Sequence, residues 1–349
     1  MITRRQFLAG LGTATVVVAA GAAARLTGGG HGRSCAWGIY ANDNLPVGGG
    51  SPDYWAYVDL LESKLGRGFA GWRRNGITAA DDLAAYRKCY DRGWRWSYAN
   101  GTQRGSDNVI DGFWADTARG VYDGFYDRFF RTISADPRWT SANPFHFSFH
   151  HEQYVVAEGG GPAAGSAADY GAAFRHVRSR MDAVGAHVSQ GGNMLMCFVP
   201  HWRQFFGDPV FGSWRPTTAV APFVVSRVDP GAQSYDKVGA DIYLTAGETL
   251  SASAQWSPVR SFALDRGKSF FAGEAGVAGD DSKVLAYLGE LGDQLKRWGA
   301  GTGAGRAEAI CWTSRVTSLG DLRLDATPAR LAAFRTMAND SFYAATAPA

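Results

Sequence analysis

The chain has 349 residues, of which 46% are hydrophobic and 19% are charged, and its formal net charge is +3. This is the composition of a globular protein with a large core, divided into at most a few domains. No long run of Lys or Arg is present, so the sequence does not indicate a nucleic-acid partner. Aromatic residues make up 13% of the chain and include 12 Trp, which fits either a well-packed core or flat surfaces that bind sugar rings.

The first 30 residues have the pattern of an export signal. Arg4 and Arg5 precede an apolar stretch over residues 7–24 that ends in three alanines, a small-residue cleavage site. A membrane anchor is the alternative, but the stretch is rich in Gly and Ala and weak for a stable span. We therefore expect residues 1–30 to be a cleaved twin-arginine signal peptide. The mature protein would be secreted, either extracellular or associated with the cell wall, with no stable membrane span.

Eight short apolar runs, bounded by turn residues, have the length of fully buried strands. They span residues 34–41, 67–74, 94–100, 145–150, 193–200, 237–244, 268–276 and 308–314. Helix patterns lie between them, at residues 52–66, 80–93, 111–133, 170–185 and 281–299, with a closing helix within 325–340. This alternation predicts an α/β fold, a single (β/α)8 TIM barrel over residues 31–345. A doubly wound open sheet is the competitor, but no glycine-rich nucleotide turn follows the first strand.

Four cysteines are spread widely along the chain, at Cys35, Cys89, Cys197 and Cys311. Their spacing resembles no metal motif, and three of them lie in apolar, strand-like runs. We expect buried, inert thiols. A bridge between Cys35 and Cys311 is the alternative if their segments are neighbours.

Two carboxylates stand at the ends of expected strands. Glu152 follows the fourth strand, and Glu274 ends the apolar core of the seventh. Barrel enzymes place catalytic residues at the C-terminal ends of strands, and strands four and seven face each other across the barrel. Two facing carboxylates suit glycoside hydrolysis, with retention at a separation of about 5–5.5 Å and inversion at about 6.5–9.5 Å. The alternative is two ordinary strand-end charges paired with arginines.

The stretch FHFSFHHEQ, residues 145–153, joins a strand to two histidines and a glutamate. The alternating Phe residues are typical of a barrel strand, and the side chain of His150 should point away from that of His151. A structural role is therefore expected for His150. A metal site is the alternative, but adjacent histidines do not easily ligate one ion, and no HExxH spacing is present. We expect no metal and no cofactor.

Several segments resemble glycoside hydrolase family 26, which belongs to a clan of retaining barrel glycosidases. FHHEQ and KSFFAGEAG are similar to its two catalytic motifs, on strands four and seven. Residues 169–202 resemble its following helix and fifth strand, and residues 235–244 resemble its sixth strand, which ends in Asp-x-Tyr. Residues 321–340 resemble its closing helix, so the similarity covers roughly residues 140–340.

The resemblance implies roles for five residues. Glu152 would be the acid/base, Glu274 the nucleophile, and His151 the histidine that precedes the family's acid/base. Tyr243 would hydrogen-bond the nucleophile beside the sugar, and Trp312 would form a platform under that sugar. From the residues alone, Tyr243 and Trp312 could each be core instead.

Further substrate-binding candidates share a position at or beside strand ends: His201, Trp202, Trp37, Tyr40, Arg73 and Asn100. Asp241 is expected inside the barrel or behind the site. The chain also departs from the family pattern, because Ser148 stands where family mannanases carry Arg. Arg73 would then support the carboxylates, or else pair with a surface acid. Gln153 and Tyr154 follow the glutamate where the family has Met-Asn-Gly and then Trp.

These observations predict a secreted retaining glycoside hydrolase that cleaves a β-linked polysaccharide, a mannan or another plant or cell-wall glycan. Its partners would be polysaccharide or oligosaccharide substrates, and we expect a monomer. Two alternatives remain: a non-catalytic barrel that binds glycan, and a glycosidase of another family that acts on arabinan or another envelope glycan.

Overall fold

A computed structural model describes residues 35–40, 54–75, 80–94, 96–101, 111–154, 164–299, 303–314, 316–317 and 319–343. All of these belong to one compact unit, His31–Ala349. The expected export signal, residues 1–30, lies outside the described residues.

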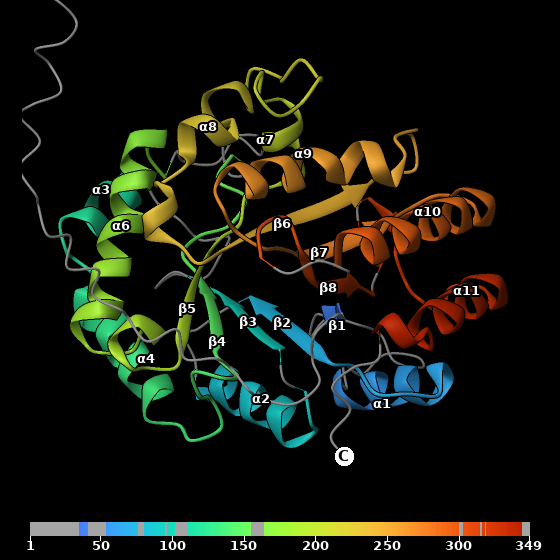
Figure 1. The fold of residues 1–349 in the computed structure, drawn as a ribbon, viewed down its shortest axis with the longest axis horizontal. Coiled ribbons are helices and arrows are strands. Elements are labelled where there is room, and N and C mark those ends of the chain that lie inside the picture. The colour runs from blue at the N-terminus through green and yellow to red at the C-terminus, as the bar shows by residue number, and fades with distance from the viewer. Residues whose placement is uncertain are drawn as a thin grey trace, which may run out of the picture. The chain divides into compact units, whose positions relative to one another are not determined.

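Eight parallel strands form a sheet that curls round on itself (Figure 1). They are β1 Ala36–Tyr40, β2 Gly71–Asn75, β3 Trp96–Asn100, β4 Phe145–Ser148, β5 Met194–Phe198, β6 Lys237–Leu244, β7 Phe270–Val277 and β8 Ala307–Thr313. Each strand pairs with the next along the chain, and β8 pairs with β1. The expected mixed α/β fold with a curled parallel sheet is therefore confirmed, and each expected strand overlaps an observed one.

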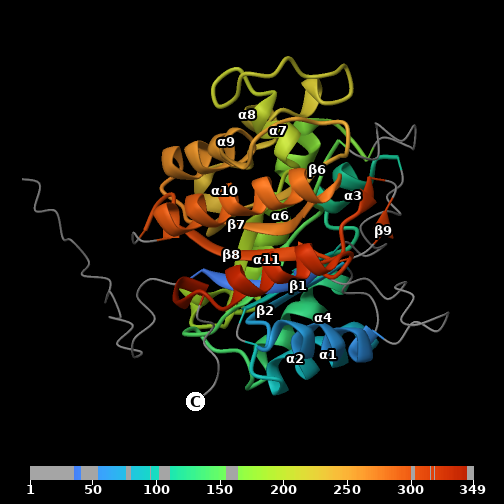
Figure 2. The same cartoon turned by 90° about the vertical axis from the view of Figure 1, so that its right-hand side faces the viewer.

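Helices surround the strands on the outside (Figures 1 and 2). They are α1 Tyr54–Leu65, α2 Ala80–Asp91, α3 Phe113–Ala118, α4 Asp123–Ser134, α6 Ala167–Ala183, α7 Trp202–Phe206, α8 Val225–Val228, α9 Ala252–Asp265, α10 Asp281–Gly299 and α11 Pro328–Ala338. Short 3-10 helices lie at Val188–Gln190, Ala221–Phe223, Ala232–Ser234 and Ser341–Tyr343, and β9 Val316–Thr317 pairs with β10 Gly320–Asp321. Within these ranges, no helix combines the length and apolar character needed to cross a bilayer.

One expected helix is two helices in the structure. Residues 111–133 were expected to be continuous, but α3 ends at Ala118 and α4 begins at Asp123. Between them Gly120 has a φ of 85°, a left-handed conformation that glycine adopts without a steric penalty and that ends the helix.

The strands bury both of their faces, in two separate clusters. Inside the sheet lie six residues: Tyr98, Cys197, Val199, Phe271, Ala309 and Cys311. Phe145 and Phe147 belong instead to the large core between sheet and helices. Because side chains alternate along a strand, the intervening His146 and Ser148 face the inside of the sheet.

The four cysteines are buried and free, as expected of inert thiols. Burial raises the pKa of the Cys35 and Cys197 thiols, which disfavours the reactive thiolate. β1 and β8 are neighbours, with Gly38 in register with Cys311. The alternative bridge between Cys35 and Cys311 is not formed.

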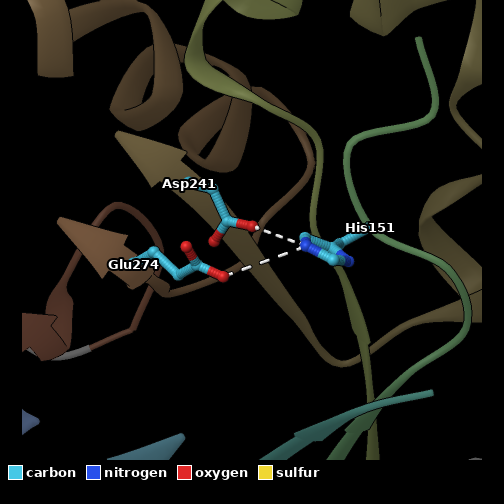
Figure 3. Close-up of side chains that lie close together, drawn as sticks. All are labelled: His151, Asp241 and Glu274. Atoms are coloured by element: carbon cyan, nitrogen blue, oxygen red, sulfur yellow. Dashed lines mark ion pairs between the residues drawn. The ribbon is translucent and has the colours of Figure 1, made fainter. Parts of the chain in front are cut away.

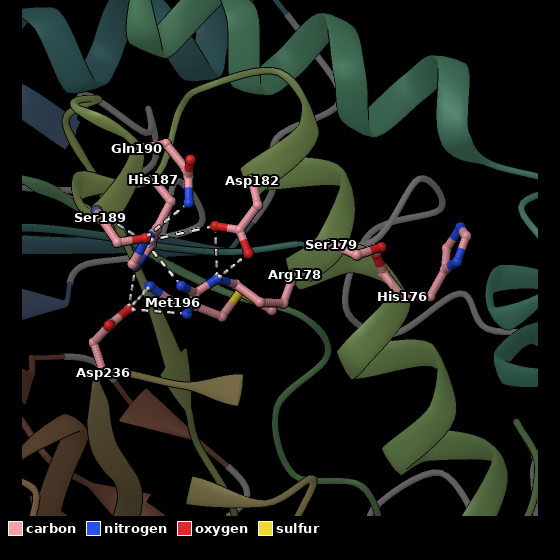
Figure 4. A network of polar contacts seen from close by, with 9 residues as sticks. All are labelled: His176, Arg178, Ser179, Asp182, His187, Ser189, Gln190, Met196 and Asp236. Atoms are coloured by element: carbon pink, nitrogen blue, oxygen red, sulfur yellow. Dashed lines mark hydrogen bonds and ion pairs between the residues drawn. The ribbon is translucent and has the colours of Figure 1, made fainter. Parts of the chain in front are cut away.

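A polar network holds α6 to the N-terminal ends of β5 and β6 (Figure 4). Arg178 donates to His187 Nδ1 at 2.8 Å, so the imidazole carries its hydrogen on Nε2, which lies 2.9 Å from Asp236 Oδ2. The same oxygen accepts from the Met196 N–H at 2.7 Å. Burial opposes the charge of Asp236, but the bonds from His187 and Met196 prevail and lower its pKa. This end of a barrel usually serves stability, so we assign the network a structural role.

Candidate active site

The chain that follows β4 makes a strained turn around His151. His150 and Glu152 have φ angles of 42° and 49°, a left-handed conformation that costs a non-glycine residue about 1–3 kcal/mol. Trp114 Nε1 donates to His150 Nδ1 at 2.8 Å, and Gln153 Nε2 donates to the His150 carbonyl at 3.0 Å. His150 is buried, in agreement with its expected structural role. These bonds hold the turn that presents His151 and Glu152.

A bulge in β7 places Glu274 beside Asp241. The pairing of β6 with β7 runs from Ala240 opposite Ala272 directly to Asp241 opposite Glu274, so Gly273 is the extra residue. A Cβ atom on Gly273 would lie 2.8 Å from Asp241 Oδ1. Bulges of this kind re-aim a side chain, and glycine tolerates the close approach. The two carboxylates thus become neighbours on the inner side of the sheet.

His151 lies at the centre of three carboxylates. Its Nε2 is 3.5 Å from Asp241 Oδ2, 3.7 Å from Glu152 Oε2 and 3.9 Å from Glu274 Oε1. Figure 3 shows Asp241 and Glu274 projecting from neighbouring strands toward the imidazole. Glu274 and Asp241 are buried, whereas 18% of the Glu152 side chain is exposed. Three segments distant in sequence therefore converge on one imidazole nitrogen.

The shared histidine limits the separation of the two glutamates. Glu152 Oε2 and Glu274 Oε1 lie 3.7 and 3.9 Å from His151 Nε2, so the two oxygens cannot be farther apart than the sum of these distances. That limit admits a retaining separation of about 5–5.5 Å and only the short end of the inverting range of about 6.5–9.5 Å. The pair expected from the sequence is thus brought together at a distance suited to work on one glycosidic bond.

Tyr243 contacts the expected nucleophile. Its hydroxyl donates to Glu274 Oε2 and lies 2.8 Å from Thr313 Oγ1. One oxygen of Glu274 is therefore held by a phenol, while the other faces His151. This is the contact that the resemblance implied for Tyr243.

His201 also reaches the site. It caps α7 just after β5, and its Nε2 lies 3.8 Å from Glu152 Oε1. Burial, with a smaller effect of the Arg203 charge, lowers the pKa of His201 well below its usual value, so the imidazole is neutral.

Trp202 does not reach the site as an open platform. It is only 3% exposed, with its ring packed between His201 and Phe206, and its expected role as a sugar-binding residue does not fit this burial.

Trp312 lies in the core between the sheet and the helices. It is 1% exposed, its ring packs at 4.7 Å on Phe334 of α11, and its Nε1 donates to the Leu322 carbonyl at 3.0 Å. This burial and packing do not fit the sugar platform that the resemblance implied. On β8 the side chains alternate, so Cys311 and Thr313 face the inside of the sheet and Trp312 faces the helices.

Four other candidates lie on β1, β2 and β3, and their side chains fall outside the described part of the chain: Trp37, Tyr40, Arg73 and Asn100. Their backbones place Arg73 in register with Tyr98, and Asn100 in register with Ser148. Ser148 is fully buried.

The sequence analysis assigned no role to Trp114, Tyr154 or Thr313. Thr313 alternates with Cys311 along β8, but that alternation does not show which of the two sides faces the inside of the sheet. Trp114 comes from a helix about 36 residues before His150, and no local pattern links the two. Tyr154 contacts His201 Nδ1 at 3.0 Å across 47 residues of chain.

The same cluster has the size of a cation site. Ligand atoms of His151, Asp241 and Glu274 lie within 4.8 Å of one another, and one imidazole with two carboxylates suits a divalent ion. However, Tyr243 already holds Glu274, and His151 also faces Glu152. These contacts favour a carboxylate pair positioned for chemistry, and a metal-free site remains our expectation.

Comparisons with known proteins found similar folds among solved structures. No protein-family model and no curated protein matches the sequence. Among solved structures, the catalytic domain of the Bacillus sp. JAMB-750 family 26 endo-β-1,4-mannanase has a TM-score of 0.59 and 15% identity, covering 89% of this chain and 87% of that one. A Cellulomonas fimi endo-β-1,4-mannanase double mutant has a TM-score of 0.56 and 18% identity, covering 88% and 71%.

A Muricauda sp. family 26 structure, GH26C, has a TM-score of 0.58 and 13% identity, covering 89% of this chain and 87% of that one. Sequence identities this low show that the folds are alike. The chemistry has to be argued from the residues of the site itself. Over about nine-tenths of its length, the chain has the fold of solved structures of glycoside hydrolase family 26.

Proposed function

We propose that the chain is a retaining glycoside hydrolase of the (β/α)8 type that cleaves a β-linked polysaccharide, with mannan as the first candidate. The observation that carries the proposal is the convergence of Glu152 and Glu274 on the same nitrogen of His151. The likeness to family 26 mannanase structures supports the substrate class. The signal pattern in residues 1–30 supports action outside the cell.

In the first step Glu274 attacks the anomeric carbon as a carboxylate. The bond to the leaving sugar breaks, its oxygen takes a proton from Glu152, and a covalent glycosyl-enzyme forms. Tyr243 holds Oε2 of Glu274, so Oε1, which faces His151, is the oxygen assigned to the attack. The burial of Glu274 favours a nucleophile that is kept from water until substrate enters.

In the second step Glu152 acts as a base. It takes a proton from a water molecule, whose oxygen attacks the anomeric carbon and releases the Glu274 carboxylate. The partial exposure of the Glu152 side chain suits this role, because the leaving sugar and then the water must reach it. His151 contacts Asp241 and both glutamates, and so orients the pair.

The test is a screen of residues 31–349 against mannans, mixed-linkage glucan, xylans, galactans and arabinans. We expect product from one polymer, none from Glu274→Ala, and azide rescue of Glu152→Ala with an activated aryl glycoside, because azide replaces water without base catalysis. Asp265→Asn, which removes an exposed carboxylate on α9, is the matched control and should keep full activity. Full activity in Glu274→Ala would overturn the proposal. Glycan binding without product would point to a binding protein.

A further inference from the structure

His201 connects a buried tyrosine to the exposed member of the glutamate pair. Its Nδ1 lies 3.0 Å from the Tyr154 hydroxyl, and its Nε2 lies 3.8 Å from Glu152 Oε1. The imidazole is buried and stands at the N-terminus of α7, directly after the connection from β5. Tyr154 follows Glu152 by two residues, so one short segment contributes both ends of this chain of contacts.

The hydrogen bonds assign the tautomer of His201. The backbone N–H of Arg203 donates to Nδ1 at 3.2 Å, and Nδ1 is therefore an acceptor, which Tyr154 also approaches as an O–H donor. Since burial keeps the ring neutral, its one hydrogen is on Nε2, the nitrogen that faces Glu152.

The charged groups around the ring do not change this assignment. Arg203, on the same helix, pairs with Glu248 at 3.0 Å. From β6, Asp241 pairs with His201 through the backbone, and its carboxylate faces His151. Glu152 is thus the carboxylate at ion-pair distance from the His201 ring in the described part of the chain.

Glu152 has a strained backbone and a histidine facing each of its carboxyl oxygens. With a φ of 49°, its side chain leaves the turn at an angle that few non-glycine residues adopt. Its Oε2 faces His151 at 3.7 Å, and its Oε1 faces His201. A neutral N–H can orient one oxygen and favours the ionised acid less strongly than a cation would.

We infer that Tyr154 and His201 act as a positioning pair that aims the carboxyl group of Glu152 at the glycosidic oxygen. This inference rests on the proposed function. It changes the role expected for His201 from binding sugar to orienting the acid. The contact of 3.8 Å would shorten in the substrate complex, as catalytic hydrogen bonds often do.

The experiment uses two aryl glycosides of the disaccharide unit of the polymer that the screen identifies, which for a mannan are the two mannobiosides named next. Phenyl β-mannobioside has a poor leaving group that needs a proton, whereas 2,4-dinitrophenyl β-mannobioside has one that leaves without it. We expect His201→Phe, which keeps a ring but no N–H, to lower kcat/KM about 100-fold on the phenyl glycoside and less than about 3-fold on the dinitrophenyl glycoside. His201→Gln, whose amide restores a donor near the Nε2 position, should recover about 10-fold of that loss.

Tyr154→Phe is the second variant and removes one oxygen atom. It should lower kcat/KM about 5-fold on the phenyl glycoside with little effect on the other, because the ring of His201 would lose one of two bonds at Nδ1. It also carries the test if His201→Phe does not fold. His176→Gln, a histidine on α6 that pairs with Asp123, is the matched control and should behave as the unmodified protein.

Equal losses on both glycosides would show a merely structural role and overturn the inference, as would unchanged kcat/KM in His201→Phe. The proposed function is tested separately. It would be overturned if the unmodified protein cleaved neither glycoside and no polysaccharide in the screen. That result would also overturn the inference, which rests on the proposed function. A leaving-group dependence that appears only in the His201 and Tyr154 variants supports the positioning pair.

Discussion

Asp241 and Glu274 are register partners on neighbouring strands because Gly273 is bulged out of the pairing between β6 and β7. In a regular strand Gly273 would take that place, and Glu274 would point to the opposite face. The bulge therefore decides that a glutamate faces the carboxylate of β6 and the imidazole of His151.

Gly273→Ala should damage the site more than the fold. The new Cβ would lie 2.8 Å from Asp241 Oδ1 and 3.3 Å from Tyr98 Cε1, both buried. We expect a loss of about 1–3 kcal/mol in the free energy of unfolding, measured with urea, and a fall in kcat of about 100-fold. Gly289→Ala on α10, where a Cβ meets nothing within 4 Å, is the control and should not lower stability. A kcat unchanged by Gly273→Ala would contradict the role of the bulge.

Tyr243→Phe should lower kcat with a smaller change in KM. The variant keeps the ring but removes the hydroxyl that donates to Glu274, and losing one such donor costs about 10²–10³-fold in kcat where the bond strengthens in the transition state. Steady-state kinetics on the polymer identified by the screen measure this. Tyr343→Phe, in the 3-10 helix Ser341–Tyr343, removes a hydroxyl far along the chain and serves as the control. Equal kcat values for the two variants would argue against the contact.

Trp312→Phe should weaken the fold and leave substrate binding unchanged. The substitution removes the bond to the Leu322 carbonyl and part of the packing on Phe334, a loss of about 1–3 kcal/mol in the free energy of unfolding. Thermal unfolding and KM, measured together, separate the two effects. A large rise in KM without loss of stability would restore the platform role that the sequence suggested.

Removing metal ions should not change activity, because the residues that could surround a cation have other contacts. Activity after EDTA treatment should equal that of the untreated protein, whereas added Zn²⁺ should inhibit by binding His151, Asp241 and Glu274. Inactivation by EDTA that Zn²⁺ or Mn²⁺ reverses would contradict the metal-free mechanism.

The stability that Asp236 contributes should depend on pH. Its pKa is lower in the folded protein than its ordinary value of 3.8, so its contribution is present above that value and is lost as pH falls through the folded pKa. Asp236→Asn should therefore cost about 1–3 kcal/mol in the free energy of unfolding at pH 7 and progressively less below about pH 4. Urea unfolding at several pH values measures this. An equal loss at pH 7 and pH 3 would show that the charge is not involved.

Much of this architecture could be predicted from the sequence. Each of the eight apolar runs overlaps an observed strand, because buried parallel strands are short, apolar and bounded by turn residues. The helices were predicted less completely: α9 was not among those expected, and residues 111–133 form two helices. Glu152 and Glu274 were identifiable because a carboxylate is costly to bury, so one that ends an apolar strand is typical of a functional site. The buried thiols follow from the same apolar context.

Only the tertiary structure separated Tyr243 from Trp312. Both are aromatic residues near the end of an apolar strand, yet one contacts Glu274 and the other packs on α11. In a strand buried on both faces, alternation defines two sides but does not show which of them faces the inside of the sheet, since both are apolar. That choice depends on the register of neighbouring strands and on the bulge at Gly273, which are set by pairings between distant segments. The contacts from Trp114 to His150 and from Tyr154 to His201 likewise depend on how the chain folds back, so local sequence patterns could not reveal them.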